Sequence, residues 1–581
     1  MKIPSKDNIE NSNKVMSELK TYPFPSVIED LRQWPIHTKL TLEREDFMSK
    51  VVEFAKIKVV ANKKAGDLHE QLAKTLYMER IRLIENPWKV DPPDEMDFWS
   101  DIKDTLLKQV RNTDKEAQRE AYDDMLERIL MRYVREVMGN FQISTYKLAR
   151  KVLPIIFDLI LNAANGNLLL RLFVKKRILS DKLQITGSID TLRSLVTKGT
   201  IVLVPTHFSN LDSILVGWAS DRIGLTAFSY GAGINLYNNS ILAYYFSRLG
   251  AYALDRRKKN PIYMELLKAF SQLSIERGVH TLFFPGGTRS RSGQIENRLK
   301  MGLLGTAIDA QCAHYQRGEM DKKIFIVPVV INYHVVLEAK GLIDQFLEHT
   351  GKELYLVEKK AFGGTMNLMK FLWQFFSSTS EIVVKYGKPM DTMGNFVDNE
   401  GNSIDKLGRP VDVKDYFISD GVVKYDYQRN EEYTKHLSQK IVERYYIENV
   451  VLSSHLVAYT AFKILLLQYS KLDFYGVLRL PKDDCIILKS KFFQNIEILR
   501  NELLKMEEQE QIQLSDIVRN ATIEELVEHG VKNVGTFHLK KAIKFDDEGD
   551  LVSEDMNLLY YYHNRLEGYN LARFLQVESI K

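Results

Sequence analysis

The sequence predicts an α/β fold, a mainly parallel sheet with helices on both faces, flanked by helical N- and C-terminal regions. Between about residues 183 and 387, short β-branched apolar runs alternate with helical segments. On either side, Glu, Lys, Arg, Leu and Ala recur at helical spacing. Continuous apolar strands separated by helices are typical of a parallel sheet covered on both faces. The 581 residues exceed one ordinary core, so we expect several domains.

Residues 1–145 are expected to form a helical N-terminal domain, interrupted by the turn-forming stretch NPWKVDPPDE at 86–95. The N-terminus lacks the apolar core of a secretory signal, which favours the cytoplasm. No stretch approaches the ~18 uninterrupted apolar residues that a spanning helix needs. If this chain meets a membrane, we expect it to lie on the surface.

Residues 146–180 are expected to form a helical hairpin with basic ends. Two short apolar segments are hinged at Asn165 and Gly166 and flanked by lysines and arginines. Such a hairpin suits the surface of an anionic bilayer, through residues 146–177, where each nearby cation contributes ~1 kcal/mol. A core helix pair with solvated ends is the alternative, and the sequence leaves both open.

Residues 181–390 contain the predicted α/β domain. Its strand candidates are LQITGS (183–188), TIVLVPT (200–206), LTAFSY (225–230), HTLFFPG (280–286), IFIVPVVINY (324–333) and EIVVKYG (381–387). A loop-rich connection at 391–429 is expected to be a hairpin or an ordered excursion. A helical C-terminal region follows at 430–581. No repeat of fixed period stands out in the sequence.

Composition excludes several classes of function. The net charge of +4 argues against a strongly basic nucleic-acid-binding domain. The two cysteines, Cys312 and Cys485, are far apart, which excludes a disulfide framework or a cysteine-rich zinc site. Histidines His207, His280, His314 and His334 are scattered without metal-ligand spacing, so we expect neither metal nor other cofactor.

The H-x4-D stretch HFSNLD places His207 and Asp212 directly after a predicted strand. On one helix, five residues turn a side chain by ~140° net, so the pair needs a bend to meet. A strand ending near Thr206 and a helix capped by Ser209 or Asn210 would supply that bend. A carboxylate that holds one imidazole nitrogen leaves the other to accept a proton, which makes a general base.

The nucleophile is not evident from the sequence. Ser209 and Ser213 are candidates, but no G-x-S-x-G elbow occurs in the chain, so the nucleophile is expected to be the substrate. Taken alone, the pair also fits a capping aspartate beside a structural histidine.

One basic cluster follows a short apolar run, and a second follows a predicted strand. One is the run Arg256, Arg257, Lys258 and Lys259; the other is the loop GGTRSR at 286–291. Glycines after a strand let the backbone approach an anion, and arginines offer paired donors to its oxygens. We therefore expect a phosphate group here, although neither cluster is a nucleotide-binding loop. Arginines on a solvated rim are the alternative reading.

In their order, HFSNLD, LGAYALDRR, FFPGGTRSRSG and IVPVVINY resemble the four sequence blocks of the glycerolipid acyltransferases, and most of all the glycerol-3-phosphate acyltransferases. The resemblance spans about residues 200–333. It implies the glycerolipid acyltransferase fold, with His207 as general base and Asp212 as its partner. It further implies phosphate binding by Arg256, Arg289, Arg291 and Lys300, a substrate-site loop of Gly286, Gly287 and Thr288, and Pro328 at a strand end beside the acyl donor.

Two departures from the family pattern affect the acceptor site. The third block usually reads F-P-E-G-T-R, and here Gly286 replaces its glutamate. The second block is one residue longer than its commonest form, which leaves open whether Arg256 or Arg257 corresponds to the phosphate-binding arginine; we favour Arg256.

The resemblance implies transfer of a fatty acyl group from acyl-CoA or acyl-carrier protein to glycerol-3-phosphate, the first step of phospholipid synthesis. The expected location is peripheral, on the inner face of the cell membrane, with no nucleic-acid partner. Alternatives are acylation of 1-acylglycerol-3-phosphate (lysophosphatidic acid), hydrolysis of acyl thioesters, and a non-catalytic lipid-binding protein of the same fold.

Overall fold

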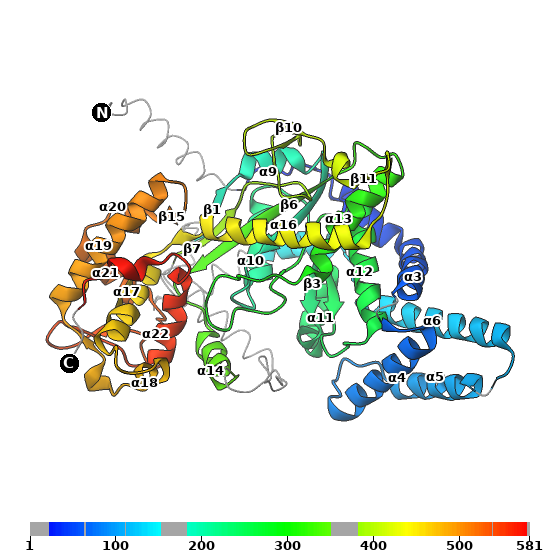
Figure 1. Ribbon diagram of the computed structural model, residues 1–581, viewed down its shortest axis with the longest axis horizontal. Helices are drawn as coiled ribbons and strands as arrows, with labels where there is room; N and C mark the ends of the chain where they lie inside the picture. The colour runs from blue at the N-terminus through cyan, green and yellow to red at the C-terminus, as the bar shows by residue number, and fades with distance from the viewer. Residues whose placement is uncertain are drawn as a thin grey trace.

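The computed structural model describes residues 23–62, 65–110, 112–152, 183–349, 381–536 and 538–577. Three parts lie side by side in Figure 1: helices of the N-terminal region in blue, a central sheet, and the C-terminal helices in orange to red. The predicted fold class is confirmed, because a mainly parallel sheet is flanked by helical regions. The predicted segment boundaries stay predictions.

The N-terminal part consists of helices that pack against the sheet domain. Its elements are η1 (Leu31–Gln33), α2 (Pro35–His37), η2 (Thr38–Leu42), α3 (Arg44–Ala61), α4 (Leu68–Glu85), α5 (Glu95–Val110) and α6 (Lys115–Val137). Asp67 and Glu70 form a capping box at the start of α4. Buried side chains of α3 and α6 share one apolar cluster with α12 (Pro261–Glu276) of the sheet domain.

The central sheet has seven strands in the order β1-β7-β6-β2-β5-β3-β4. The strands are β1 (Leu183–Gly187), β2 (Gly199–Pro205), β3 (Ser229–Gly233), β4 (Ala251–Leu254), β5 (Thr281–Leu282), β6 (Lys323–Tyr333) and β7 (Ile382–Tyr386). All neighbours pair in parallel except β6 and β7. The predicted run 225–230 becomes a strand only at Ser229.

Helices cover both faces of this sheet. The remaining helical elements of the domain are α9 (Ile189–Leu195), α10 (Asp212–Arg222), η4 (Ile234–Asn238), α11 (Ser240–Arg248), α13 (Met301–Gln316) and α14 (Ala339–His349). Along β2, Ile201 and Leu203 belong to a cluster with α9 and α10, whereas Val202 and Val204 belong to a cluster with α13. Alternate residues of β2 therefore face two separate apolar layers, as a strand buried on both sides requires.

The chain between the sheet and α16 (Tyr427–Ile447) forms small hairpin turns, not an extended loop. Asp391, Asp398 and Asp405 are seven residues apart, and each accepts backbone N–H groups two and four positions on. A D-x-x-G repeat was thus missed in the sequence analysis, because it spans only three turns. The elements here are β8 (Phe396–Val397), β9 (Ser403–Ile404), β10 (Pro410–Val411), η5 (Val413–Phe417), β11 (Ile418–Ser419) and β12 (Val422–Val423).

The C-terminal part surrounds α17 (Ser453–Gln468), which is buried along most of its length. Its other elements are β13 (Val450–Val451), α18 (Phe474–Leu478), η6 (Lys482–Asp484), β14 (Ile486–Ile487), α19 (Lys489–Glu508), β15 (Gln513–Leu514), α20 (Asp516–Asn520), α21 (Ile523–Asn533), β16 (Lys544–Phe545), β17 (Leu551–Val552), α22 (Met556–His563), η7 (Asn564–Leu566) and η8 (Leu571–Phe574). Within the described residues, no helix has the length and apolar character to cross a bilayer.

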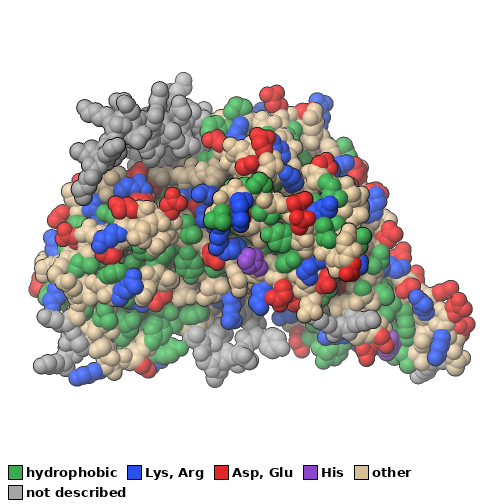
Figure 2. Space-filling view, turned by 45° about the horizontal axis from the view of Figure 1, so that its top comes forward, with side chains coloured by type: hydrophobic (Ala, Val, Ile, Leu, Met, Phe, Trp, Pro, Cys, Tyr) green, Lys and Arg blue, Asp and Glu red, His purple; other side chains and the backbone are tan. Residues whose placement is uncertain are grey.

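The predicted basic hairpin at 146–180 lies mostly outside the described residues. Its first residues are described: Tyr146 and Arg150 both contact the Asp221 carboxylate on α10. On the face shown in Figure 2, basic and acidic side chains are interspersed among apolar ones.

Candidate active site

Three of the four sequence blocks follow strands whose carboxyl ends meet at one edge of the sheet. β2 precedes His207, β4 precedes Arg256, and β5 precedes the glycine loop. Because β2, β5, β3 and β4 are parallel, these loops emerge on the same side. Ligands of open α/β sheets bind in this position.

His207 and Asp212 meet across a tight turn between β2 and α10. His207 Nδ1 lies 2.8 Å from Asp212 Oδ2, and the same oxygen accepts the backbone N–H groups of Phe208 (2.6 Å) and Ser209 (2.9 Å). The expected bend is therefore present, and Asp212 opens α10 as its first residue. The helix is capped by Leu211, not by Ser209 or Asn210, because the Asp212 carboxylate itself organises the turn.

The Asp212 carboxylate is fully buried and acts as an acceptor on both oxygens. Tyr333, at the end of β6, donates its hydroxyl to Oδ1. Burial and the adjacent Asp212 charge raise the pKa of Tyr333 well above its usual value, so it remains a donor. All the other partners donate to Asp212, so we assign a hydrogen to His207 Nδ1. Nε2 is then the nitrogen that can accept a proton.

The loop of the third block holds His207 in place. The His207 ring stacks on Phe284, with centroids 4.1 Å apart and planes 24° apart. Ser290 donates its backbone N–H to the His207 carbonyl at 2.7 Å. The first and third blocks, far apart in the chain, are thus joined directly at the histidine.

Glu338 links Arg289 to the turn that carries His207. It lies 3.4 Å from Arg289 Nη1 and accepts the Asn210 backbone N–H at 2.9 Å. It also accepts the Ser209 hydroxyl at 3.1 Å, and Ser209 is fully buried. Ser209 is therefore badly placed to act as the nucleophile.

The glycine loop brings Lys300 close to the end of β5. Gly287 has a φ of +77°, in the region that favours glycine, and a Cβ there would lie 2.6 Å from Lys300 Cδ. Lys300 donates its backbone N–H to the Pro285 carbonyl at 2.7 Å. Thr288 and Arg291 on the same loop are partly buried. Arg289, Arg291 and Lys300 thus come from one loop and its immediate continuation.

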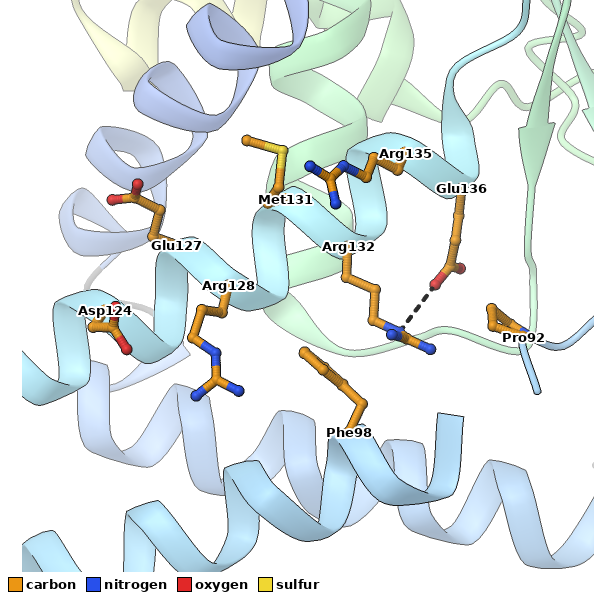
Figure 3. Close-up of a pocket in the computed structure, with 9 residues that line it drawn as sticks. All are labelled: Pro92, Phe98, Asp124, Glu127, Arg128, Met131, Arg132, Arg135 and Glu136. Carbon is orange, nitrogen blue, oxygen red and sulfur yellow. Dashed lines mark ion pairs between the residues drawn. The ribbon is translucent and has the colours of Figure 1, made fainter. Parts of the chain in front are cut away.

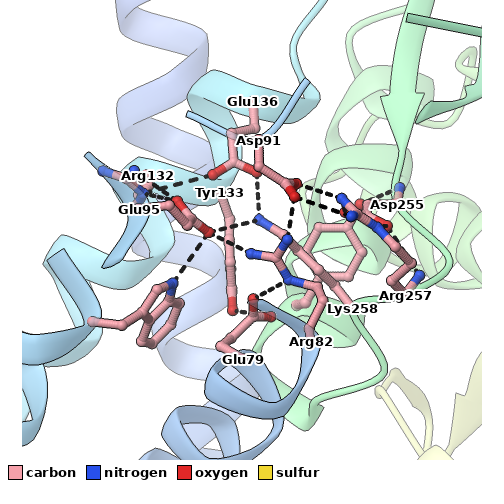
Figure 4. Close-up of polar contacts among 12 residues, drawn as sticks. Glu79, Arg82, Asp91, Glu95, Arg132, Tyr133, Glu136, Asp255, Arg257 and Lys258 are labelled. Carbon is pink, nitrogen blue, oxygen red and sulfur yellow. Dashed lines mark hydrogen bonds and ion pairs between the residues drawn. The ribbon is translucent and has the colours of Figure 1, made fainter. Parts of the chain in front are cut away.

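The second block divides its basic residues between two environments. Arg256 is exposed. Arg257 is paired with Asp91 and Asp255 and lies 4.3 Å over the Trp88 ring, and Lys258 pairs with Glu136 (Figure 4). Arg257 is thus occupied in tying the N-terminal helices to the end of β4, whereas Arg256 faces solvent.

Pro328 does not lie at a strand end, as the sequence analysis expected. It pairs with Val204 in the middle of β6, five residues before the end of the strand. Its carbonyl accepts the Gly387 N–H at 2.8 Å, just beyond the last residue of β7. The nitrogen of a strand residue faces the same neighbour as its carbonyl. The missing N–H of Pro328 therefore lies where the regular pairing with β7 ends, between the pair Val329–Tyr386 and the bridge Ile326–Met390.

Arg565 enters the site from the C-terminal part and was not foreseen. Its guanidinium lies 3.6 Å over the Phe208 ring, and Nη2 donates to the Ile331 carbonyl at 2.8 Å. Nη1 is buried without a hydrogen-bond partner. Burial lowers the pKa of Arg565 to about 10. No spacing in the sequence indicates this contact, since Arg565 lies 234 residues beyond Ile331.

A pocket of about 550 Å³ lies elsewhere, in the N-terminal part (Figure 3). It is lined by Pro92, Phe98, Asp124, Glu127, Arg128, Met131, Arg132, Arg135 and Glu136. None of the predicted site residues lines it. Within the described ranges, no group of three or more His, Cys, Asp or Glu side chains is arranged to hold a metal ion.

Comparisons with known proteins match the sheet domain. Residues 186–332 match the family model described as Acyltransferase. A glycerol-3-phosphate acyltransferase of Pseudomonas aeruginosa (strain UCBPP-PA14) is 23% identical over 290 residues, covering 50% of this chain and 30% of that protein. One from Alteromonas mediterranea is 30% identical over 161 residues, covering 27% of this chain and 19% of that protein. The matched part is less than a third of either relative's length.

Among solved structures, the 1-acyl-sn-glycerophosphate acyltransferase of Thermotoga maritima covers 64% of this chain and 95% of that one. Its sequence identity to this chain is 13% and the TM-score is 0.24. The family match coincides with the strands and loops that carry His207, Asp212 and the basic loops. The sheet domain of this chain is therefore similar to acyltransferase domains, including those of the glycerol-3-phosphate acyltransferases.

Proposed function

We propose that this protein transfers a fatty acyl group from an acyl thioester to the hydroxyl of glycerol-3-phosphate. The observation that carries the proposal is the contact between His207 Nδ1 and Asp212, joined through the His207 carbonyl to the loop of Arg289 and Arg291. A base and a set of phosphate-binding side chains thus share one edge of the sheet. The names of the curated relatives support the choice of acceptor.

In this mechanism His207 Nε2 accepts the proton of the glycerol hydroxyl as its oxygen attacks the thioester carbonyl carbon. The carbon–sulfur bond of the resulting tetrahedral intermediate then breaks, and the imidazolium returns the proton to the leaving thiolate. Asp212 stabilises the imidazolium and holds its orientation. General-base catalysis of this kind contributes about 10²- to 10⁴-fold to the rate.

The phosphate of the acceptor is held by Arg289, Arg291 and Lys300, with Arg256 reaching from the second block. Arg289 is only weakly engaged by Glu338, at 3.4 Å, so a phosphate oxygen can replace that contact. Fixing the phosphate orients the hydroxyl beside Nε2, which replaces a random encounter by a positioned one. Gly287 and Thr288 provide the backbone along which the acceptor lies.

The donor in this proposal is acyl-CoA or acyl-carrier protein, and no cofactor takes part. Acylated products partition into a bilayer, so the protein acts on the inner face of the cell membrane, with residues 146–177 as the contact. We expect binding to anionic vesicles that weakens with added salt, and an absence of binding would contradict that location.

The direct test incubates purified protein with labelled glycerol-3-phosphate and acyl-CoA. His207→Ala is expected to lower the rate at least about 100-fold, because it removes the base. His436→Ala, which changes an exposed histidine on α16, is the matched control and should keep full activity.

Full activity of His207→Ala would overturn the mechanism. Transfer to 1-acylglycerol-3-phosphate but not to glycerol-3-phosphate would show that 1-acylglycerol-3-phosphate is the acceptor. Release of free fatty acid without any acceptor would indicate a thioester hydrolase, and lipid binding without turnover would indicate a non-catalytic protein.

A further inference from the structure

The side chain of Glu296 occupies the space in front of Gly286. A Cβ added at Gly286 would lie 3.0 Å from Glu296 Cγ and 3.2 Å from Glu296 Oε1. Glu296 comes from the loop that leads from the third block to α13. The glycine that replaces the usual glutamate of the third block thus faces a carboxylate that comes from further along the same loop.

Glu296 also contacts the backbone of the proposed base. Its Oε1 accepts the His207 backbone N–H at 2.8 Å. Ser290 donates its own N–H to the His207 carbonyl at 2.7 Å. Both backbone polar groups of His207 are therefore held by the loop after β5, one by a side chain and one by the main chain.

The second oxygen of this carboxyl group is buried and lacks a hydrogen-bond partner. Glu296 is partly exposed as a residue, but its Oε2 is inaccessible to solvent. Burial raises the pKa of Glu296 to about 7, opposed by the positive Arg565 and reinforced by the negative Asp212. A buried, incompletely bonded carboxyl group costs stability, so its place beside His207 calls for a functional reason.

We propose that Glu296 is a positioning residue for acyl transfer, which holds His207 by its backbone N–H and supplies the carboxyl group that position 286 lacks. This inference rests on the proposed function. It predicts that the carboxyl group can be delivered from either position, since both place it in the same space. A residue that only fills volume would not have that property.

The test compares Glu296→Ala, Glu296→Gln and the exchange variant Glu296→Ala with Gly286→Glu. Glu296→Ala is expected to lower kcat by about 10- to 100-fold, with little change in KM for glycerol-3-phosphate, because Arg289, Arg291 and Lys300 still hold the phosphate. Glu296→Gln keeps an oxygen that can accept the His207 N–H and should lose less than Glu296→Ala. The exchange variant should recover at least about tenfold over Glu296→Ala.

A second measurement does not depend on turnover. The rate at which diethyl pyrocarbonate modifies His207, followed by mass spectrometry of its peptide, should change in Glu296→Ala and return toward the wild-type value in the exchange variant. If the wild-type protein transfers no acyl group, the proposed function fails, while this measurement still decides whether Glu296 positions His207.

Two results would overturn the inference. One is a Glu296→Ala protein with wild-type kcat and wild-type modification of His207. The other is a loss of activity that follows a loss of thermal stability across all three variants, with no recovery in the exchange variant, since this describes a purely structural side chain.

Discussion

Two buried charge clusters lie near the carboxyl ends of the parallel strands, one beyond β4 and one beyond β2, and they differ in how completely their arginines are paired. In the N-terminal cluster, Arg82 is paired with Glu79, Asp91 and Glu95 (Figure 4). Beside His207, Arg565 and Glu296 each keep one buried polar atom without a hydrogen-bond partner.

This difference separates charge used for assembly from charge available for chemistry. A guanidinium surrounded by three carboxylates is satisfied within the protein and ties α4, α5 and the turn between them together. Incompletely bonded groups around His207 retain capacity for a substrate or for proton movement. Arg257, in the second block, belongs to the first case, since it joins the N-terminal cluster through Asp91.

The largest effect is expected at the His207 contact. Asp212→Asn keeps the shape of the side chain and one oxygen for the Phe208 and Ser209 N–H groups, but it removes the charge that orients and stabilises the imidazolium. We expect kcat to fall by about 10³-fold or more, with a small change in melting temperature. Steady-state rates and calorimetry measure the two effects; a rate within tenfold of wild type would place the catalytic centre elsewhere.

The next largest effect is on stability. Arg82→Met leaves Glu79 buried without its arginine and leaves Glu95 with Arg132 alone of its two arginines, which should cost about 3–5 kcal/mol. Arg128→Met removes an exposed partner of Asp101 and should cost less than about 1 kcal/mol. Urea unfolding of both variants measures the costs. Equal values would show that the buried network around Arg82 stabilises the protein no more than an exposed ion pair does.

A pH dependence follows from the raised pKa of Glu296. The folded-state pKa of about 7 exceeds the ordinary glutamate pKa of 4.5, so between these values the folded protein holds a proton that the unfolded chain has released. The resulting stability is present at low pH and is lost as pH rises through about 7, by about 3 kcal/mol in total. The stability of Glu296→Gln relative to wild type should rise over that range when unfolding is measured from pH 5 to 8. A constant difference would contradict the raised pKa.

The smallest effect expected distinguishes the two kinds of arginine. Arg289→Ala should raise KM for glycerol-3-phosphate by about 10- to 100-fold, the equivalent of one charged hydrogen-bonding group, with little loss of stability. Arg257→Ala should instead lower the free energy of unfolding, because Asp91 and Asp255 lose their partner. The opposite pattern would show that Arg257 is the phosphate-binding residue.

The sequence sufficed for the sheet and for the local part of the site. Strands buried on both faces leave continuous apolar runs, and His207 and Asp212 are separated by a single turn, so local rules apply to both. The strand that begins at Ser229 departed most from its predicted start, because the apolar residues before it pack without joining the ladder, and β4 was not among the predicted strands.

The missing parts of the site come from distant segments. Tyr333 lies within the fourth block and contacts Asp212 from the end of the neighbouring strand β6. Glu338 follows that block, and Arg565 belongs to the C-terminal part. Local sequence periodicity does not predict contacts between segments so far apart in the chain. The prediction that Pro328 lies at a strand end was wrong for the same reason. Whether β6 can continue through a proline depends on where β7 ends beside it, and the tertiary structure sets that point.

The packing of Arg565 onto Phe208 also sets a time at which the site can be complete. A ribosome that adds ~5–20 residues per second needs roughly 10–50 seconds to travel the 234 positions from Ile331 to Arg565. Until then the nascent chain lacks Arg565. A product that terminates earlier would therefore contain His207 without the guanidinium that packs on Phe208.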